Sequence, residues 1–334
     1  MSSFDVVVPC YKYARYLEEC VLSVLSQPVD VRVLIIDDAS PDDTPEIAES
    51  LVRRDSRVTY RRNASNRGHI STFNEGLDWC AGDYNLLLSA DDLLTPGALA
   101  RAAFAMDRHP NAALCYGGIL RISCATPYPA PSTSAAECAY AVLPGAEWLA
   151  SLCRDPSESI TSPEAIVRTR VQKEVGRYSK DLPHTGDQEM WMRIASRGDV
   201  VRLCADQAYY RIHSRAMHLE RFGEAVTDIR HRKAAFDRFF SVGGLPDAEA
   251  RRLASLAGEG LARMALWDAY RAFHQGDAAL CRTLEELAAE IWPASRTWAL
   301  SARVRLMRTV GPRRWSRLTR IAGMRRHTPG EAPA

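Results

Sequence analysis

The N-terminal part of the chain alternates short apolar runs with longer amphipathic segments. Such runs are typical of strands buried on both faces, and they lie at Phe4–Val8, Val31–Ile36, Val58–Tyr60, Tyr84–Leu88 and Ala113–Tyr116. Between them, apolar residues recur at helical spacing, which predicts helices starting at Tyr13 and Thr44, from Ile70 to about Cys80, and from Leu99 to Met106. Strands that alternate with helices indicate an α/β fold, with a mostly parallel sheet flanked by helices.

The rest of the chain has shorter elements and then becomes helical. Strands are predicted at Glu164–Arg168, Val200–Cys204 and Gln207–Ile212, and helices at Gly145–Cys153, at Thr169–Val175 and from Asp187. Residues 124–134 are rich in Pro, Ser and Thr, which predicts a loop. From about Glu220 the chain is predicted to be helical, with breaks at Gly243-Gly244, Gln275-Gly276-Asp277 and Gly311-Pro312.

Polar residues follow the predicted strands at one edge of the sheet. They are Pro9 to Lys12, Asp38, Asn66 to His69, and the pair Asp91 and Asp92. The carboxyl ends of parallel strands meet in one crevice, where open α/β sheets bind their ligands. After the acidic pair, Thr95 and Pro96 predict an N-cap and a first helical residue. The two carboxylates are explained either by a solvated turn or by a cation held against an anionic ligand.

Each candidate site residue has a functional and a structural interpretation. Asp38 can accept a hydrogen bond from a base or a ribose, or can form an Asx turn with Ser40. Tyr11 can stack on a base or pack in a loop, and His213 can be a ligand or a structural histidine. Asp187 can be a helix N-cap or a general base, and the helix N-terminus is expected to favour its charged form.

Composition narrows the class of protein only modestly. The chain has 334 residues, 46% hydrophobic and 25% charged, with a net charge of +2, which is ordinary for a globular protein. Nine scattered cysteines without C-x-x-C argue against a disulfide framework and for a reducing cytoplasm. We expect no signal peptide and no membrane span, because a strand begins at Phe4 and no apolar run approaches the required length.

Missing motifs exclude several enzyme classes. No G-x-G-x-x-G follows the first predicted strand, which argues against a dinucleotide-binding domain. No G-x-x-x-x-G-K-[ST] is present, so a P-loop NTPase is excluded, and no G-x-S-x-G elbow occurs.

Six motifs, in order between residues 6 and 213, resemble family 2 glycosyltransferases of the GT-A fold. They are Val6-Val7-Val8-Pro9-Cys10-Tyr11, Ile35-Ile36-Asp37-Asp38-Ala39-Ser40, Asn66-Arg67-Gly68, Ser89-Ala90-Asp91-Asp92, Gly186-Asp187-Gln188-Glu189-Met190-Trp191 and Tyr210-Arg211-Ile212-His213. The resemblance implies inverting transfer of a sugar from a nucleotide diphosphate donor to an acceptor hydroxyl, assisted by Mg²⁺ or Mn²⁺. It also implies a glycosyltransferase domain over residues 1–216, with a donor and metal half at 1–118 and an acceptor and base half at 119–216.

The resemblance also assigns roles to individual residues. It places Pro9, Tyr11 and Asp38 at the base, and Asp91 near the ribose and diphosphate. It makes Asp92 a metal ligand, His213 a further ligand to metal or diphosphate, and Asp187 the general base. Ser89 stands where the family often has Asp, and Phe73 where it often has Arg. We therefore expect Arg67 or His69 to meet the diphosphate.

The predicted helical region, residues 217–334, becomes strongly basic at its end. Residues 291–330 contain no Asp or Glu but many arginines, with Trp and Leu among them. This basic region has three possible interpretations: a solvated basic face, a helix on the inner membrane surface, or a nucleic-acid-binding segment. The last is disfavoured because no recognised nucleic-acid-binding module accompanies the charge. Membrane contact would suit a lipid-linked acceptor, but small-molecule and glycan acceptors remain alternatives. A homo-oligomer also remains an alternative to a monomer. A non-catalytic nucleotide-sugar-binding protein is the main alternative function, and a nucleotidyltransferase the lesser one.

Overall fold

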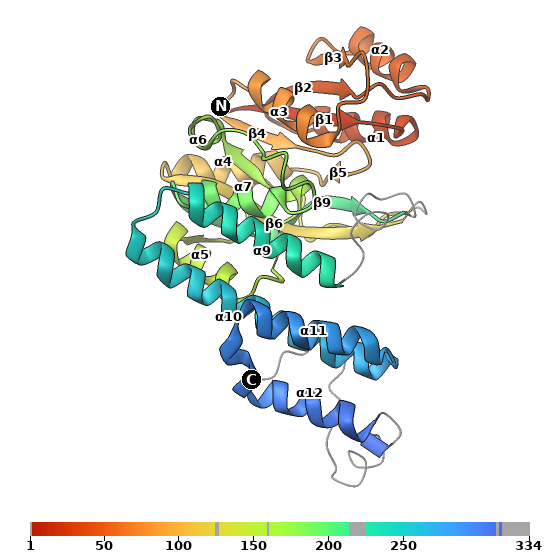
Figure 1. Ribbon diagram of the computed structural model, residues 1–334. Coiled ribbons are helices and arrows are strands. Elements are labelled where there is room, and N and C mark those ends of the chain that lie inside the picture. Colours follow the sequence, from red (N-terminus) through yellow and green to blue (C-terminus); the bar gives the residue numbers. More distant parts are fainter. Residues whose placement is uncertain (1, 124–126, 159, 214–224, 312–313, 316–334) are drawn as a thin grey trace.

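The computed structural model describes residues 2–123, 127–158, 160–213, 225–311 and 314–315. A mixed sheet with helices on both faces forms the upper part of the molecule, and the C-terminal helices extend below it (Figure 1). The sheet order is β3-β2-β1-β4-β8-β6-β9-β5, and β7 pairs with β9 beside this path. The predicted α/β class with a helical C-terminal extension is therefore confirmed.

The first half of the chain follows the predicted βα alternation. Its elements are β1 (Ser3–Cys10), α1 (Ala14–Leu25), β2 (Asp30–Asp37), α2 (Thr44–Arg54), β3 (Val58–Arg62), α3 (His69–Trp79), β4 (Tyr84–Leu87), β5 (Leu93–Leu94) and α4 (Ala98–Arg108). Strand β1 pairs in parallel with β2 and β4, and β2 with β3. The carboxyl ends of these four strands therefore meet at one edge.

Alternating side chains of the central strands fill two separate cores, because successive residues of a strand point to opposite faces. Val6 and Val8 of β1 pack in the core under α1, α2 and α4, and Val7 in the core under α3, α5 and α7. All three valines have no exposed surface, which explains why the buried strands show no alternation of polar and apolar residues.

The second half of the sheet domain is built around one long pair of parallel strands, β6 and β9. Its elements are β6 (Ala112–Ile122), β7 (Tyr140–Leu143), α5 (Gly145–Arg154), the 3-10 turn η1 (Ser162–Glu164), β8 (Ile166–Arg168), α6 (Thr169–Val175), α7 (Gly186–Ala195) and β9 (Asp199–Arg211). Strand β6 runs parallel to β9, whereas β8 is antiparallel to both β4 and β6. The sheet is thus parallel at one end and mixed at the other.

Four details of the predicted elements are wrong. Residues 199–211 form one strand, not two, because the pairing of β9 with β6 continues through shifts in register near Gly118. The short strands β5 and β7 were not predicted from the sequence. Thr95 is no N-cap: its hydroxyl donates to the Asp206 carbonyl at 2.7 Å, and α4 begins after Gly97, whose φ is 77°.

The C-terminal helices share a core with one face of the sheet. They are α9 (Ala225–Val242), α10 (Asp247–Gln275), α11 (Ala278–Ile291), the 3-10 turn η2 (Pro293–Thr297) and α12 (Ala299–Val310). One hydrophobic cluster runs from Leu34 of β2 through Met190 of α7 to Met307 of α12. The breaks predicted near Gly243, Gly276 and Gly311 coincide with helix ends. The proposed domain boundary at residue 216 lies outside the described residues.

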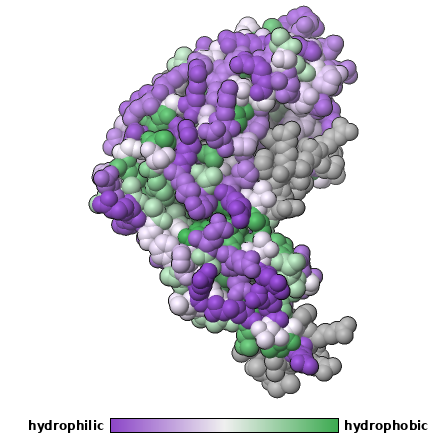
Figure 2. Space-filling view, viewed as in Figure 1, coloured by the Kyte–Doolittle hydropathy of each residue, from purple (hydrophilic) through white to green (hydrophobic). Residues whose placement is uncertain are grey.

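The predicted basic face is only partly described, since residues 312–313 and 316–334 lie outside the described residues. In α12, Arg308 pairs with Glu285 at 3.3 Å, and Arg305 donates to the Arg296 carbonyl at 2.9 Å. Figure 2 shows hydrophobic residues at the surface where the sheet meets the lower helices, and hydrophilic residues above and below this junction. Within the described residues, no helix is long and apolar enough to cross a membrane.

Candidate functional site

The acidic pair lies in the tight connection between β4 and β5, at the carboxyl edge of the sheet. Asp91 and Asp92 are both buried, with 8% and 3% of their surface exposed. The Asp92 amide donates to the Ser89 carbonyl at 2.9 Å, which closes the turn. The carboxylates therefore belong to a fixed turn rather than to a solvated one.

The end of β9 meets this turn. The His213 Nε2 lies 2.9 Å from Asp91 Oδ2, and the Arg211 amide donates to Asp92 Oδ1 at 2.9 Å. Tyr13 and Tyr16 pack their rings against the His213 ring at 5.5 and 5.6 Å. The structure thus brings His213 next to the acidic pair Asp91 and Asp92, from which it is widely separated in the sequence.

Electrostatics in this cluster favour an added positive charge. Burial, and then the charge of Asp91, hold the pKa of Asp92 well above its usual range. His213 Nδ1 is buried without a hydrogen-bond partner among the described residues. The same described residues hold no group of three or more His, Cys, Asp or Glu arranged as a metal cage. Mg²⁺ and Mn²⁺ sites in nucleotide enzymes need only one or two carboxylates together with substrate phosphates, so this donor set fits such an ion.

Asp38 lies at the end of β2 and organises the neighbouring loop. Its Oδ1 accepts from Asn63 Nδ2 at 2.7 Å and from the Arg67 amide at 2.9 Å, and its Oδ2 accepts from the Gly68 amide at 2.8 Å. A carboxylate has about four acceptor positions, so Asp38 retains capacity for one further donor. Asp38 does not form the expected Asx turn with Ser40, because the Ser40 amide donates instead to Asp37 Oδ1, three residues before it, at 2.7 Å.

The loops after β1 and β2 contain unusual backbone conformations. Among the described residues, Lys12 and Ala39 are the non-glycine residues with positive φ, at 65° and 60°. The Lys12 amide donates to Ser40 Oγ at 3.1 Å, which ties the two loops together. Such strain is typical of functional sites. Tyr11 is 38% exposed beside them, and Pro9 lies within β1 rather than in the predicted loop.

The two candidate diphosphate ligands differ in their placement. The Arg67 side chain forms an exposed ion pair with Glu75 of α3 at 3.0 Å. His69 begins α3, and its Nε2 lies 2.8 Å from the Pro183 carbonyl, in the loop that leads to α7. His69 therefore connects the two halves of the crevice, whereas Arg67 lies at its edge.

Asp187 occupies the first turn of α7. The helix is preceded by Thr185, so Asp187 is not the N-cap. Ser162 Oγ donates to Asp187 Oδ2 at 2.7 Å, while Oδ1 has no hydrogen-bond partner among the described residues. Burial raises the pKa of Asp187, against the opposing effects of Ser162, Tyr178 and the nearby histidines. Burial thus opposes the expected effect of the helix terminus, which favours the charged form of this carboxyl.

Tyr210 of β9 lies near both acidic groups. Burial, and then the charges of Asp92, Asp91 and more weakly Asp187, raise the pKa of Tyr210 to about 12. An electrostatic effect of this kind requires the carboxylates to be near the same phenol. The acidic pair and Asp187 therefore lie in the same region of the molecule.

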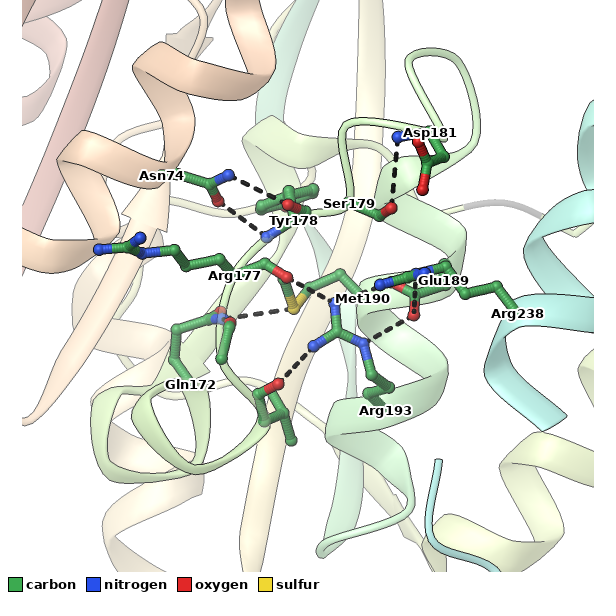
Figure 3. Close-up of polar contacts among 12 residues, drawn as sticks. Asn74, Gln172, Arg177, Tyr178, Ser179, Asp181, Glu189, Met190, Arg193 and Arg238 are labelled. Atoms are coloured by element: carbon green, nitrogen blue, oxygen red, sulfur yellow. Dashed lines mark hydrogen bonds and ion pairs between the residues drawn. The ribbon is translucent and has the colours of Figure 1, made fainter. Parts of the chain in front are cut away.

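Helix α7 is anchored by a buried ion pair (Figure 3). Glu189, with no exposed side chain, accepts from Arg193 Nε and Nη2, both at 2.8 Å. Arg193 also donates to the Arg177 carbonyl at 3.0 Å. In the same view, Asn74 of α3 exchanges two hydrogen bonds with the Tyr178 backbone, at 3.0 and 2.8 Å. These contacts fix the loop and the helix that carry Asp187.

Reasoning from the sequence missed Arg211, which holds the acidic turn in place. Its Nε donates to the Asp91 carbonyl at 2.8 Å, its Nη2 pairs with Glu19 at 3.0 Å, and its Nη1 donates to Tyr128 at 3.1 Å. The arginine is 3% exposed. Its place two residues before His213, in an assigned motif, was the available signal. Ser162 and Asn74 carried no such signal, because their partners are distant in the chain.

A cavity of about 1160 Å³ lies apart from these residues, between β6, β9, α5 and the start of α10. None of the site residues predicted from the sequence lines it. Its inner wall includes Ile160 and Glu164, next to Ser162. The cavity is therefore separate from the crevice but close to the environment of Asp187.

Residues 5–158 match the family described as Glycosyl transferase family 2. The glycosyltransferase GlyG of Streptococcus pneumoniae is 31% identical over 91 residues, which cover 27% of this chain and 30% of that protein. The GalNAc(5)-diNAcBac-PP-undecaprenol beta-1,3-glucosyltransferase of Campylobacter jejuni is 32% identical over 102 residues, or 30% of this chain and 33% of that protein. The matches thus span about a third of each relative's length.

Solved structures agree on the fold over nearly the whole chain. S. aureus TarS 1–349 in complex with UDP-GlcNAc has a TM-score of 0.62 at 16% identity, covering 97% of this chain and 93% of that one. The mannosyltransferase PcManGT from Pyrobaculum calidifontis, in complex with GDP-Man and Mn²⁺, has a TM-score of 0.55 at 16% identity, covering 96% and 84%. The match to glycosyltransferase family 2 thus lies in residues 5–158, and the chain as a whole has the GT-A fold of these solved structures.

Proposed function

We propose that this protein transfers a sugar from a nucleotide diphosphate donor to an acceptor hydroxyl, with inversion and with the help of a divalent metal ion. The observation that supports the proposal is the buried cluster of Asp91, Asp92 and His213 at the carboxyl edge of the sheet, with Asp187 at the start of α7 as the candidate base. Two solved proteins of the same fold are described in complex with UDP-GlcNAc and with GDP-Man and Mn²⁺.

The donor would lie along the carboxyl ends of β1, β2 and β4. Tyr11 offers a half-exposed ring to the base beside Pro9, and Asp38 has an acceptor position left for a base or ribose donor. Asp91 would meet the ribose and diphosphate, with His69 nearer to the diphosphate than Arg67. When bound, Mg²⁺ or Mn²⁺ would be held by Asp92 and Asp91 with His213 beside them, and would act as a Lewis acid on the leaving diphosphate.

Asp187 is the candidate general base. Its Oδ1 has no partner among the described residues and is thus available for the acceptor hydroxyl. Burial raises its pKa, and a carboxylate with a raised pKa is a stronger proton acceptor once ionised. Direct displacement requires base and leaving group on opposite sides of the sugar. Inversion therefore requires Asp187 and the acidic pair to meet the sugar from opposite sides.

Replacing the base tests the proposal. In Asp187→Asn, we expect turnover to fall by roughly 10²–10⁴-fold, while nucleotide binding is retained because the acidic pair is unchanged. The measurement is release of nucleoside diphosphate from the donor sugar, and Asp181→Asn, in the preceding loop, is the matched control. Full turnover in Asp187→Asn would exclude Asp187 as the base, and no turnover in the wild type with nucleotide binding intact would favour a non-catalytic binding protein.

A nucleotidyltransferase is the weaker alternative. Such enzymes need a glycine-rich loop after the first strand to hold a triphosphate, and Pro9-Cys10-Tyr11-Lys12 contains no glycine. The cytoplasmic location stays a prediction from cysteine usage. The eight cysteines among the described residues are free.

A further inference from the structure

Two buried polar atoms near the start of α7 have no hydrogen-bond partner among the described residues. They are the Tyr178 hydroxyl and Asp187 Oδ1. The Tyr178 ring lies against Gly186, the neighbour of Asp187 in the chain, because a Cβ atom at Gly186 would lie 3.2 Å from Cδ1 of this ring. A buried polar group without a partner is unfavourable, and most such groups in proteins are paired. The two atoms are therefore candidates to pair with each other.

The phenol and the carboxyl also affect the ionisation of each other. Burial, and then the charge of Asp187, raise the pKa of Tyr178 well above its usual range. Burial raises the pKa of Asp187, whereas Ser162 and then Tyr178 lower it. Mutual effects of this kind require the two groups to be close. The phenol keeps its proton at neutral pH and can donate it in a hydrogen bond to a carboxylate.

Helix α3 holds Tyr178 in place from the donor side of the molecule. Asn74 exchanges two hydrogen bonds with the Tyr178 backbone, at 3.0 and 2.8 Å (Figure 3). The Phe73 ring packs edge-on against the Tyr178 ring, with centroids 5.7 Å apart, and against the His69 ring at 5.5 Å, a favourable arrangement for aromatic rings. Phe73, which departs from the family pattern, thus connects the candidate diphosphate ligand His69 with Tyr178.

The opposite oxygen of the Asp187 carboxyl is already held. Ser162 Oγ donates to Oδ2 at 2.7 Å. A second donor on Oδ1 would fix the plane of the carboxylate from both sides. Because a carboxylate oxygen has about two acceptor positions, Oδ1 would still have one free for the hydroxyl that it deprotonates. A base held in one orientation satisfies the geometric requirement of the reaction better than a rotating one.

We propose that Tyr178 is a positioning residue for the candidate base, and that its hydroxyl donates to Asp187 Oδ1 and holds the carboxylate in one orientation. The positioning role rests on the proposed function of Asp187, but the pairing of the two side chains does not. Helix α3 then contributes to both halves of the site, since it begins at His69 and holds Tyr178 through Phe73 and Asn74.

The pH dependence of turnover tests the positioning role. Tyr178→Phe keeps the ring and removes the hydroxyl. We expect the acid limb of its kcat/KM profile to move to higher pH by about one unit, equivalent to a roughly tenfold lower rate on that limb. Tyr84→Phe is the matched control, because Tyr84 is also buried and its hydroxyl donates to Asp107 at 2.6 Å, away from the site residues.

A purely structural role of the Tyr178 hydroxyl would lower the rate by the same factor at every pH. An acid limb that stays in place or moves to lower pH in Tyr178→Phe, or one that moves equally in Tyr84→Phe, would overturn the proposal.

Melting temperatures test the pairing without any activity. At pH 8, the losses caused by Tyr178→Phe and Asp187→Ala should not add in the double variant, because either change alone removes the pair. The losses of Tyr84→Phe and Asp187→Ala should add. Additive losses for Tyr178→Phe and Asp187→Ala would overturn the proposal. A non-additive result in a wild type that shows no turnover would support the pair and contradict the glycosyltransferase function instead.

Discussion

Asp187 is subject to two effects that oppose each other. Burial raises its pKa, and the hydrogen bond from Ser162 lowers it. Because a general base must be ionised, the rate is expected to rise with pH through this pKa. The Ser162 hydroxyl thus favours the ionised, active form of this carboxyl.

Ser162→Ala removes a hydrogen bond that favours the ionised carboxylate. We expect the pKa of Asp187 to rise further, so that the acid limb of the kcat/KM profile moves to higher pH while the rate at high pH changes little. The matched control is Ser157→Ala, because the Ser157 hydroxyl bonds to Asp155 instead. An acid limb that stays in place, or moves to lower pH, would show that Ser162 does not control this carboxyl.

The sequence was enough to propose four acidic site residues, because each follows a predicted strand or begins a predicted helix: Asp38, Asp91, Asp92 and Asp187. The individual hydrogen bonds of these residues could not be predicted. The Ser40 amide donates to Asp37 rather than to Asp38, and only the fold shows that Asp38 instead accepts from the amides of Arg67 and Gly68. Long-range partners of this kind depend on loop conformation, which a local pattern does not encode.

Helix α7 contains a buried ion pair whose arginine, Arg193, also donates to the carbonyls of Val175 and Arg177 in the preceding segment. Removing one partner of a buried pair leaves an uncompensated charge, which costs about 3–5 kcal/mol. We therefore expect Glu189→Ala to lower the free energy of unfolding by roughly that amount, measured by urea denaturation. Replacing both Glu189 and Arg193 with apolar residues should restore part of the loss, since neither charge is then unpaired.

The exposed pair Lys233–Asp237, one turn apart in α9 at 2.7 Å, provides the control. Both side chains are exposed, 41% and 61%, so Asp237→Ala should cost no more than about 0.5 kcal/mol. Equal losses in Glu189→Ala and Asp237→Ala would contradict the anchoring role of the buried pair.

Most elements of the N-terminal half were predictable because their hydrophobic patterns are strong and uninterrupted. The errors concern strands whose pairing is decided by distant residues. Strand β7 is a short, partly exposed segment that pairs antiparallel with β9. Asp206 interrupts the apolar pattern in the sequence, so two strands were predicted there. In the structure the Asp206 side chain accepts from the Ser132 amide at 2.8 Å, and strand β9 continues through it.

In the whole molecule, the C-terminal helices are part of the core, which extends without interruption from the sheet to Val304 and Met307 of α12. Their packing could not be read from the sequence, because the helical pattern gives an apolar face but not its partner. Packing in this core accounts for the apolar side of α12 but not for its arginines. Leu306 is 54% exposed among the arginines of α12.

We expect this basic end to contribute to binding at an anionic membrane surface, where each basic residue adds about 1 kcal/mol. Truncation after Trp315 keeps α12 and the buried Trp315 but removes several arginines, and should reduce flotation with vesicles that contain anionic lipid. Vesicles of neutral lipid are the control, and an unchanged melting temperature shows that the core is intact. Equal flotation of the full chain and the truncated chain would exclude this role.

The most direct test of the account is thermal stability with UDP, GDP, dTDP or CDP, each with and without Mn²⁺. A ligand at 100 times its Kd stabilises by about 2.7 kcal/mol. We predict a shift with one nucleotide that depends on the metal and that is lost in Asp92→Asn. No shift with any nucleotide, or a shift that neither Mn²⁺ nor Asp92 affects, would contradict a donor crevice built around the acidic pair.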